Sequence, residues 1–251
     1  MDRAKGRIMR KSLLLALLAV PFLAQAQFPK VLEKARDAVQ GGTSGGSLSN
    51  DEVIAGLKEA LEKGAERSVA EASRTDGFWG DARLRIPFPP EAEKMKSTLE
   101  RMGMQKQVEE FELTMNRAAE KASAEAAQVF IAAIKGMSVA DGFAILRGGD
   151  HAATEYLAEK TTGELTSRFR PIVETATSEV ALTSYWTPLT TAYNKAGILT
   201  GAKAVDPDLD AYVTQKAIDG LFLLIAAEEE RIREDPVART TDLLRRVFGG
   251  S

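Results

Sequence analysis

The stretch that decides the fold is LDAYVTQKAIDGLFLLIAAEEERIRE, residues 209–234. It follows Asp206-Pro207, in which an aspartate can cap a helix and a proline fits its first turn. The segment is strongly apolar around Val213, Ala217, Leu221, Phe222 and residues 224–227. It predicts the central core helix of the protein.

Two capping boxes predict where further helices begin. Ser49 and Glu52 have the required spacing, and a helix should start there. Ser138 and Asp141 repeat the spacing with an aspartate in place of the glutamate, and they predict a short helix. We expect Asp150, after the two glycines that end this short helix, to cap the next one.

Three other segments complete the predicted architecture. Apolar residues and alanines recur at spacings of three and four from Val108 to Ile134, which predicts the longest helix. In the helix after Asp150, Pro171 should produce a kink or a restart. Residues 78–90 alternate in hydropathy, but the prolines at 87, 89 and 90 lack the N–H groups that a strand ladder needs. This segment should be an extended arm lying on the helices.

The sequence therefore predicts an all-α protein, a single compact multi-helix bundle with a short extended Pro-rich arm and little or no β-structure. The composition, 44% apolar and 27% charged, is that of an ordinary globular protein. The chain has no cysteine, so the fold must be held by its core without disulfides.

The first residues have the features of an export signal. Five basic residues precede an apolar run from Leu13 to Leu23, and Ala24-Gln25-Ala26 is a small-x-small cleavage site. The run is shorter than the roughly 20 residues that a membrane span needs. We expect residues 1–26 to be a signal peptide cleaved after Ala26, 27–47 a flexible arm with a Gly/Ser linker, and 48–251 the helical domain. The protein should be periplasmic or secreted, with no transmembrane segment after cleavage.

Charge and histidine content exclude several classes of function. Removing the leader takes five basic residues from 33 and one acidic residue from 36, which leaves a net charge of −7. Nucleic acid and anionic membrane are disfavoured as partners by that charge. His151 is the single histidine, so a multi-histidine metal site is excluded, and no cofactor motif occurs. We expect neither metal nor cofactor, and the sequence specifies no oligomeric state.

Several motifs, in order along the chain, resemble a known family. They are Asn116-Arg117-Ala118-Ala119-Glu120, Ile145 to Asp150 running into Ala152-Ala153-Thr154-x-Tyr156, Tyr212-Val213-Thr214, Gly220-Leu221-Phe222, and Glu230 to Arg233 before Pro236. Over residues 48–249 the chain is similar to the bacterial family of domain of unknown function 4197. The resemblance implies an exported, helical domain of the Gram-negative type. It implies no activity, cofactor or substrate.

The polar residues in these motifs are the candidates for a site. If the charged ones are buried, other parts of the chain must satisfy them, because an unpaired buried ion costs several kcal/mol. A structural polar network is the favoured interpretation, and a ligand-binding or catalytic set is the alternative. At the glycine turn before His151, simple helix capping is favoured over an anion-binding helix N-terminus. The candidates are Asn116, Arg117, Glu120, Arg147, Asp150, His151, Thr154, Tyr212, Glu229 and Arg233.

Three functions stay open at this point. The leading hypothesis is a non-catalytic periplasmic module that binds a partner protein or a small apolar ligand held between helices. The first alternative is a hydrolase-type enzyme, with Glu, Asp or His as general acid and base and Arg stabilising charge. The second is a structural protein that maintains the cell envelope. No residue is assigned as catalytic, and a cavity shared by the candidates would favour a ligand.

Overall fold

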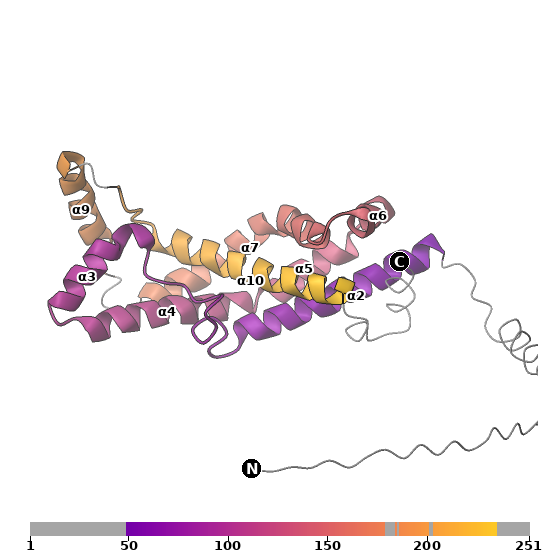
Figure 1. The fold of residues 1–251 in the computed structure, drawn as a ribbon, viewed down its shortest axis with the longest axis horizontal. Helices are drawn as coiled ribbons and strands as arrows, with labels where there is room; N and C mark the ends of the chain where they lie inside the picture. Colours follow the sequence, from indigo (N-terminus) through magenta and orange to yellow (C-terminus); the bar gives the residue numbers. More distant parts are fainter. Residues whose placement is uncertain (1–48, 179–183, 185, 201–202, 235–251) are drawn as a thin grey trace, which may run out of the picture. The chain divides into compact units, whose positions relative to one another are not determined.

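The computed structural model describes residues 49–178, 184, 186–200 and 203–234 (Figure 1). The predicted signal peptide, the N-terminal arm and linker up to residue 47 and the domain start at Leu48 lie outside these residues. So does the segment after Asp235-Pro236, a dipeptide that predicts the start of a final helix. The described helices are α2 (Asn50–Ser73), η1 (Pro90–Ala92), α3 (Glu93–Arg101), α4 (Gln105–Ser123), α5 (Ala126–Lys135), α6 (Val139–Arg147), α7 (Ala152–Ser178), α9 (Trp186–Thr200) and α10 (Leu209–Glu234).

The all-α prediction is confirmed, since no strand occurs among the described residues. Helix α10 packs against α7, α2 and α4, while α4 also packs against α7, and α2 against α5. Val213, Ala217 and Leu221 on α10 are completely buried. The prediction of a central core helix from 209 to 234 is therefore correct in both its bounds and its burial.

Both predicted capping boxes are present. The Ser49 hydroxyl accepts a hydrogen bond from the Glu52 N–H at 3.2 Å, and the Glu52 carboxylate accepts one from the Ser49 N–H at 2.9 Å. Ser138 and Asp141 make the same reciprocal pair at 3.1 and 3.0 Å. Each pair satisfies two backbone donors within one turn of chain, so sequence alone defines these helix starts.

The long helix predicted from Val108 to Ile134 is wrong, because the chain breaks into α4 and α5 at Ala124-Glu125. The Glu125 N–H bonds to the Ala122 carbonyl at 3.0 Å, a tighter turn than an α-helix makes. The buried Ser123 hydroxyl bonds back to the Ala119 carbonyl at 2.7 Å, a contact that bends helices. The break sends α5 against α2 and α7.

The helix restart expected at Pro171 does not occur, because α7 continues through this residue to Ser178. A proline inside a helix costs about 3 kcal/mol through its missing donor and its ring clash. Leu165, Phe169 and Val173, on both sides of the proline, are completely buried in the core. Their burial outweighs that cost, since each fully buried side chain of this size contributes about 1.5–3 kcal/mol.

The connection between α2 and η1 is the predicted arm. Residues 75–84 form successive turns, and residues 85–89 run without helix or strand into η1. Leu84, Ile86 and Phe88 are buried against the helices. The Phe88 ring lies 5.1 Å from that of Phe111 on α4 and 5.6 Å from that of Trp186 on α9, between centroids. The arm therefore belongs to the core of the bundle.

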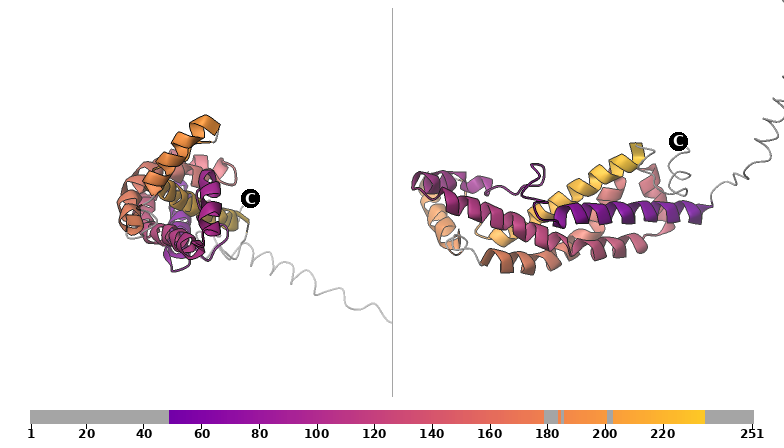
Figure 2. Two further views of the ribbon diagram at one scale, coloured as in Figure 1. Left: turned by 90° about the vertical axis from the view of Figure 1, so that its left-hand side faces the viewer. Right: turned by 90° about the horizontal axis from the view of Figure 1, so that it is seen from below.

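Helices α3 and α9 lie at one end of the bundle, at the far end of α4 from the α6–α7 turn (Figures 1 and 2). Within the described residues, no single helix has the length and hydropathy of a membrane span. The segments Gln105–Lys135 and Val139–Arg147 together reach the length and hydropathy of a span, but the chain bends by 103° between them.

Candidate functional site

One face of α4 carries three polar side chains at successive turns, Glu112, Asn116 and Glu120, which together we call the arm clamp. A spacing of four residues places them above one another on the helix. All three accept hydrogen bonds from backbone N–H groups of the arm. The arm has no neighbouring strand to satisfy its N–H groups, so these side chains take that place.

Asn116 lies at the centre of the arm clamp and is completely buried. Its side-chain oxygen accepts from the Ile86 N–H at 2.8 Å, and its amide nitrogen donates to the Ile86 carbonyl at 2.9 Å. The same nitrogen donates to the Glu112 carbonyl at 2.8 Å. The amide thus pairs with both backbone groups of Ile86, as a neighbouring strand would do.

Glu120 binds the turn at the start of the arm and is only 4% exposed. One carboxylate oxygen accepts from the N–H groups of Phe78 and Trp79 at 3.1 and 3.2 Å. The other accepts from Arg117 at 2.6 Å, and this hydrogen bond raises the pKa of Arg117. Arg117 also pairs with Asp76 at 2.7 Å. The buried charge is therefore balanced by an arginine that reaches solvent.

The third contact of the arm clamp lies at the proline end of the arm. Glu112 accepts from the Phe88 N–H at 3.2 Å and from the Lys96 ammonium at 2.7 Å. The hydrogen bond between Glu112 and Lys96 raises the pKa of Lys96. From α10, the Tyr212 hydroxyl donates to the Pro87 carbonyl at 3.2 Å. Burial raises the pKa of Tyr212 to about 12.

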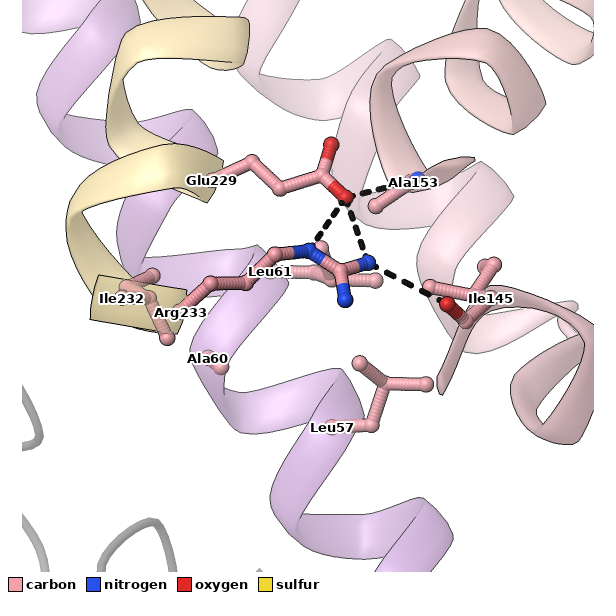
Figure 3. Close-up of a pocket in the computed structure, with 8 residues that line it drawn as sticks. All are labelled: Leu57, Ala60, Leu61, Ile145, Ala153, Glu229, Ile232 and Arg233. Atoms are coloured by element: carbon pink, nitrogen blue, oxygen red, sulfur yellow. Dashed lines mark hydrogen bonds and ion pairs between the residues drawn. The ribbon is translucent and has the colours of Figure 1, made fainter. Parts of the chain in front are cut away.

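A second polar cluster, which we call the turn clamp, consists of Glu229 and Arg233 on α10 (Figure 3). One Glu229 oxygen accepts from the Ala153 N–H at 3.0 Å, and the other from the Thr154 N–H at 2.9 Å and the Thr154 hydroxyl at 2.8 Å. Arg233 pairs with Glu229 at 2.8 Å and donates to the Ile145 carbonyl, near the end of α6, at 3.1 Å. The pair thereby joins the end of α6 to the start of α7.

The prediction that Asp150 caps α7 is wrong. This helix begins at Ala152, so the two N–H groups that a capping side chain normally accepts are those of Ala153 and Thr154. Asp150 precedes the capping position by one residue, and Glu229 takes both N–H groups from another helix. A carboxylate at a helix N-terminus is also favoured by the helix dipole.

The remaining candidates at this turn, Arg147, Asp150 and His151, are exposed. The Arg147 guanidinium lies 5.3 Å from the centre of the Phe143 ring. A Cβ on Gly148 would come within 2.5 Å of the Ala152 Cβ, so this glycine permits a close approach between the two helices. Its φ of −76° is not left-handed.

Two small cavities follow the line of contact between α2 and α10, which we call the seam. The first has about 20 Å³ for the centres of water-sized molecules, and the second about 10 Å³. Each has room for about one water molecule. Residues lining the first are Leu57, Ala60, Leu61, Ile145, Ala153, Glu229, Ile232 and Arg233 (Figure 3).

The sequence candidates thus fall into two clusters and do not share one cavity. Asn116, Arg117, Glu120 and Tyr212 hold the arm, whereas Thr154, Glu229 and Arg233 hold the α6–α7 turn. The two buried glutamates do not converge on a common cleft, which an acid–base hydrolase would need. Among the described residues, no group of three or more His, Cys, Asp or Glu side chains is placed to hold a metal ion.

Sequence reasoning missed Glu112 and Asp76. Glu112 was detectable, since it lies four residues before Asn116 on the same helix face. Asp76, beside Gly77, has only the sequence signal of a turn. Its φ of 62° and its pairing with Arg117 depend on how the arm folds back onto α4.

Comparison with known proteins gives one match. A family model described as "Protein of unknown function (DUF4197)" matches residues 47–249. This span is most of the chain, so the chain belongs to that family, and the resemblance seen in the sequence is confirmed. No curated protein and no solved structure matches the chain.

Proposed function

We propose that this member of the DUF4197 family is an exported, non-catalytic module, which acts in the periplasm by binding another protein through the end of the bundle that carries α3 and α9. The basic leader, the apolar run and the site after Ala26 support export. The mature protein should begin at Gln27, which the intact mass of the chain from a periplasmic fraction would test.

The use made of the buried charges supports a non-catalytic role. Glu120 and Glu229 direct both carboxylate oxygens at backbone N–H groups or at an arginine of the chain itself. Replacing one of the backbone contacts by a substrate would leave a backbone N–H group without a partner, at a cost of about 1–3 kcal/mol. These carboxylates are therefore better suited to holding the fold than to transferring protons.

The observation that carries the proposal is the exposure of apolar side chains at the α3 and α9 end. Ile198 on α9 is 83% exposed, and Met102, after α3, is 71% exposed. Helix α9 has one charged residue, Lys195, in 15. Exposed apolar surface that lacks charge is a feature of protein-binding sites.

The attachment of α9 explains how it can be offered to a partner. Its first turns are anchored by the buried Trp186 and Thr190. The Asn194 side chain then binds the Val205 carbonyl at 2.7 Å and the Val205 N–H at 2.8 Å. Beyond this point α9 projects from the bundle (Figures 1 and 2). Such a helix suits insertion into an apolar groove of another protein.

A small apolar ligand is less well supported. The two cavities of the seam offer about 20 and 10 Å³ to water-sized molecules. Sites for drug-sized ligands have volumes of about 300–1,000 Å³. These cavities lie within a packed interface between helices, so we prefer the protein partner.

Photo-crosslinking in the cells that produce the protein tests this proposal. A crosslinking residue at position 198 should give one adduct of defined mass, whereas the same residue at the exposed Lys160 on α7 should give none. The substitution Leu189→Asp, at a side chain on α9 that is 36% exposed, should weaken the adduct. Equal labelling at both positions, or a small molecule that co-purifies in native mass spectrometry without any adduct, would contradict the proposal.

A further inference from the structure

Trp79 and Arg85 of the arm form a stacked pair at the surface, and neither side chain takes part in the arm clamp. The Arg85 guanidinium carbon lies 3.5 Å from the centre of the Trp79 ring. At this distance the guanidinium must lie flat on the ring, because a tilted one would bring its nitrogens too close to the ring carbons. Arg85 is exposed and Trp79 is partly exposed. Tryptophan and arginine are enriched among the residues that contribute most binding energy at protein interfaces.

The arm clamp fixes the backbone on both sides of this stacked pair. Glu120 accepts a hydrogen bond from the Trp79 N–H at 3.2 Å. Asn116 binds both backbone groups of Ile86, the residue that follows Arg85. The guanidinium is therefore held between a fixed backbone and a fixed ring. Because it has little freedom to lose, the entropy cost of binding a ligand to it is low.

Two other arginines, Arg83 and Arg117, bind the carboxylates near this part of the arm. The pairs are Arg83 with Asp81 and Glu71, at 2.6 and 3.3 Å, and Arg117 with Glu120 and Asp76, at 2.6 and 2.7 Å. Arg85 has no carboxylate within ion-pair distance in the part of the chain that the structure describes. Its in-plane N–H donors are therefore free to bind a group from outside the chain.

We infer that Trp79 and Arg85 form a binding site for a carboxylate of another protein, carried on an acidic peptide segment. A guanidinium presents parallel N–H groups that match one carboxylate in a bidentate pair. Trp79 supports the guanidinium from one face and leaves its edge open to the ligand. Glu120, which holds this part of the arm, lies in the last turn of α4, whereas α3 precedes the first turn of that helix. The site is therefore separate from the α9 surface and does not depend on the partner proposed there.

The surrounding charges favour a single carboxylate over an anionic membrane. Asp76 and Asp81 belong to the same turns of the arm, and the chain without its predicted leader has a net charge of −7. An extended negative surface would be repelled by these charges. A flexible peptide can place one carboxylate on Arg85 while its other charges stay further away.

Fluorescence anisotropy with a labelled peptide of alternating glutamate and glycine, at low salt, tests this site. The purified protein should bind this peptide about 10-fold more tightly than the same peptide with glutamine in place of glutamate. Arg85→Gln should weaken binding of the glutamate peptide by a similar factor. Arg147→Gln is the matched control, because Arg147 is also an exposed arginine near an aromatic ring, and it should leave binding unchanged.

Arg85→Lys distinguishes a stacked fork from charge alone. Lysine keeps the positive charge but lacks the planar donors, so this variant should also bind the glutamate peptide less tightly than the wild type. Hydrogen exchange at the Ile86 amide should be unchanged in both Arg85 variants, since this side chain takes no part in the arm clamp.

Three results would overturn the proposal. The first is equal affinity for the two peptides, and the second is wild-type affinity in Arg85→Gln or Arg85→Lys. The third is binding to phosphatidylglycerol vesicles without binding to the glutamate peptide, which would identify a membrane as the ligand. None of these measurements involves α9.

Discussion

The arm clamp on α4 and the turn clamp on α10 both direct buried polar side chains at backbone N–H groups that secondary structure leaves without partners. In the arm clamp, Glu112, Asn116 and Glu120 each accept hydrogen bonds from backbone N–H groups in a different part of the arm. In the turn clamp one carboxylate, Glu229, receives two backbone donors, a hydroxyl and an arginine.

This difference determines how each region should respond to mutation. Removing one side chain of the arm clamp leaves the other two contacts in place. Removing Glu229 leaves the start of α7 uncapped and Arg233 without this partner, in a site where the carboxylate side chain is only 5% exposed. Stability should therefore depend most strongly on one residue at the turn and be shared among several along the arm.

The largest effect is expected for Glu229→Ala. It should lower the free energy of unfolding by about 3–5 kcal/mol, because it separates a buried ion pair and removes a helix cap. Glu230→Ala, at the neighbouring exposed position, should change it by less than about 0.5 kcal/mol. Urea unfolding followed by circular dichroism measures both. The double variant Glu229→Leu with Arg233→Leu should be more stable than Glu229→Ala. A loss below about 1 kcal/mol for Glu229→Ala would remove the contrast between the clamps.

Asn116→Ala should have the next largest effect. It leaves both backbone groups of the buried Ile86 without partners and should cost about 2–3 kcal/mol. Gln107→Ala, at an exposed position on the same helix, is the control. Hydrogen exchange should show loss of protection at the Ile86 amide while the Ala153 amide stays protected. Loss at both amides would mean that the two clamps are coupled rather than separate.

The contribution of Tyr212 to the free energy of unfolding should depend on pH in the alkaline range. Its pKa is about 12 in the fold, against 10.0 for an ordinary tyrosine, so the neutral hydroxyl is favoured by folding. The stability that it contributes is complete below pH 10 and is lost as the pH rises from 10 to about 12. Tyr212→Phe should cost about 1 kcal/mol at pH 8 through the lost hydrogen bond to Pro87.

The comparison of wild type and Tyr212→Phe by urea unfolding at pH 8 and pH 11 tests this expectation. The variant should lose less stability than the wild type between the two pH values. In a titration followed by absorbance at 295 nm, the variant should have one tyrosine fewer that ionises near pH 12. Identical losses would show that Tyr212 ionises in the fold as it does in the unfolded chain.

The smallest effect is expected for Asp76→Gly. The substitution removes an exposed ion pair with Arg117, worth about 0–1 kcal/mol, and relieves a left-handed backbone angle of 62°. The two contributions have opposite signs, so the net change should be below about 0.5 kcal/mol. Asp76→Val, which cannot adopt that angle easily, should cost about 1–3 kcal/mol. A large loss for Asp76→Gly by thermal unfolding would show that the ion pair matters more than exposure suggests.

Predictions from sequence succeeded where the interaction is local. Both capping boxes join residues three positions apart, and the structure contains both. The bounds of α10 followed from its start signal and its apolar content. Prediction failed at Asp150, because the groups that it was expected to satisfy are taken by Glu229, 76 residues away from Ala153. No spacing rule connects those positions.

In the candidate site, too, the residues could be recognised from sequence but their distant partners could not. Asn116, Glu120, Glu229 and Arg233 were recognised as polar residues in need of partners, yet their partners are backbone groups of a turn and an extended arm. A backbone group has the same chemistry at every residue, so sequence cannot reveal which one is left without a partner until the chain is folded.

Sequence by itself determined that this chain is helical, where α2, α6 and α10 begin, and which family it resembles, because periodicity and capping act within a few residues of chain. Only the tertiary structure decided that the long apolar stretch breaks into α4 and α5, that α7 passes through Pro171, and that the buried carboxylates hold the arm and the turn. Those outcomes depend on packing and hydrogen bonds between distant segments, whose free energies outweigh local preferences once the segments meet.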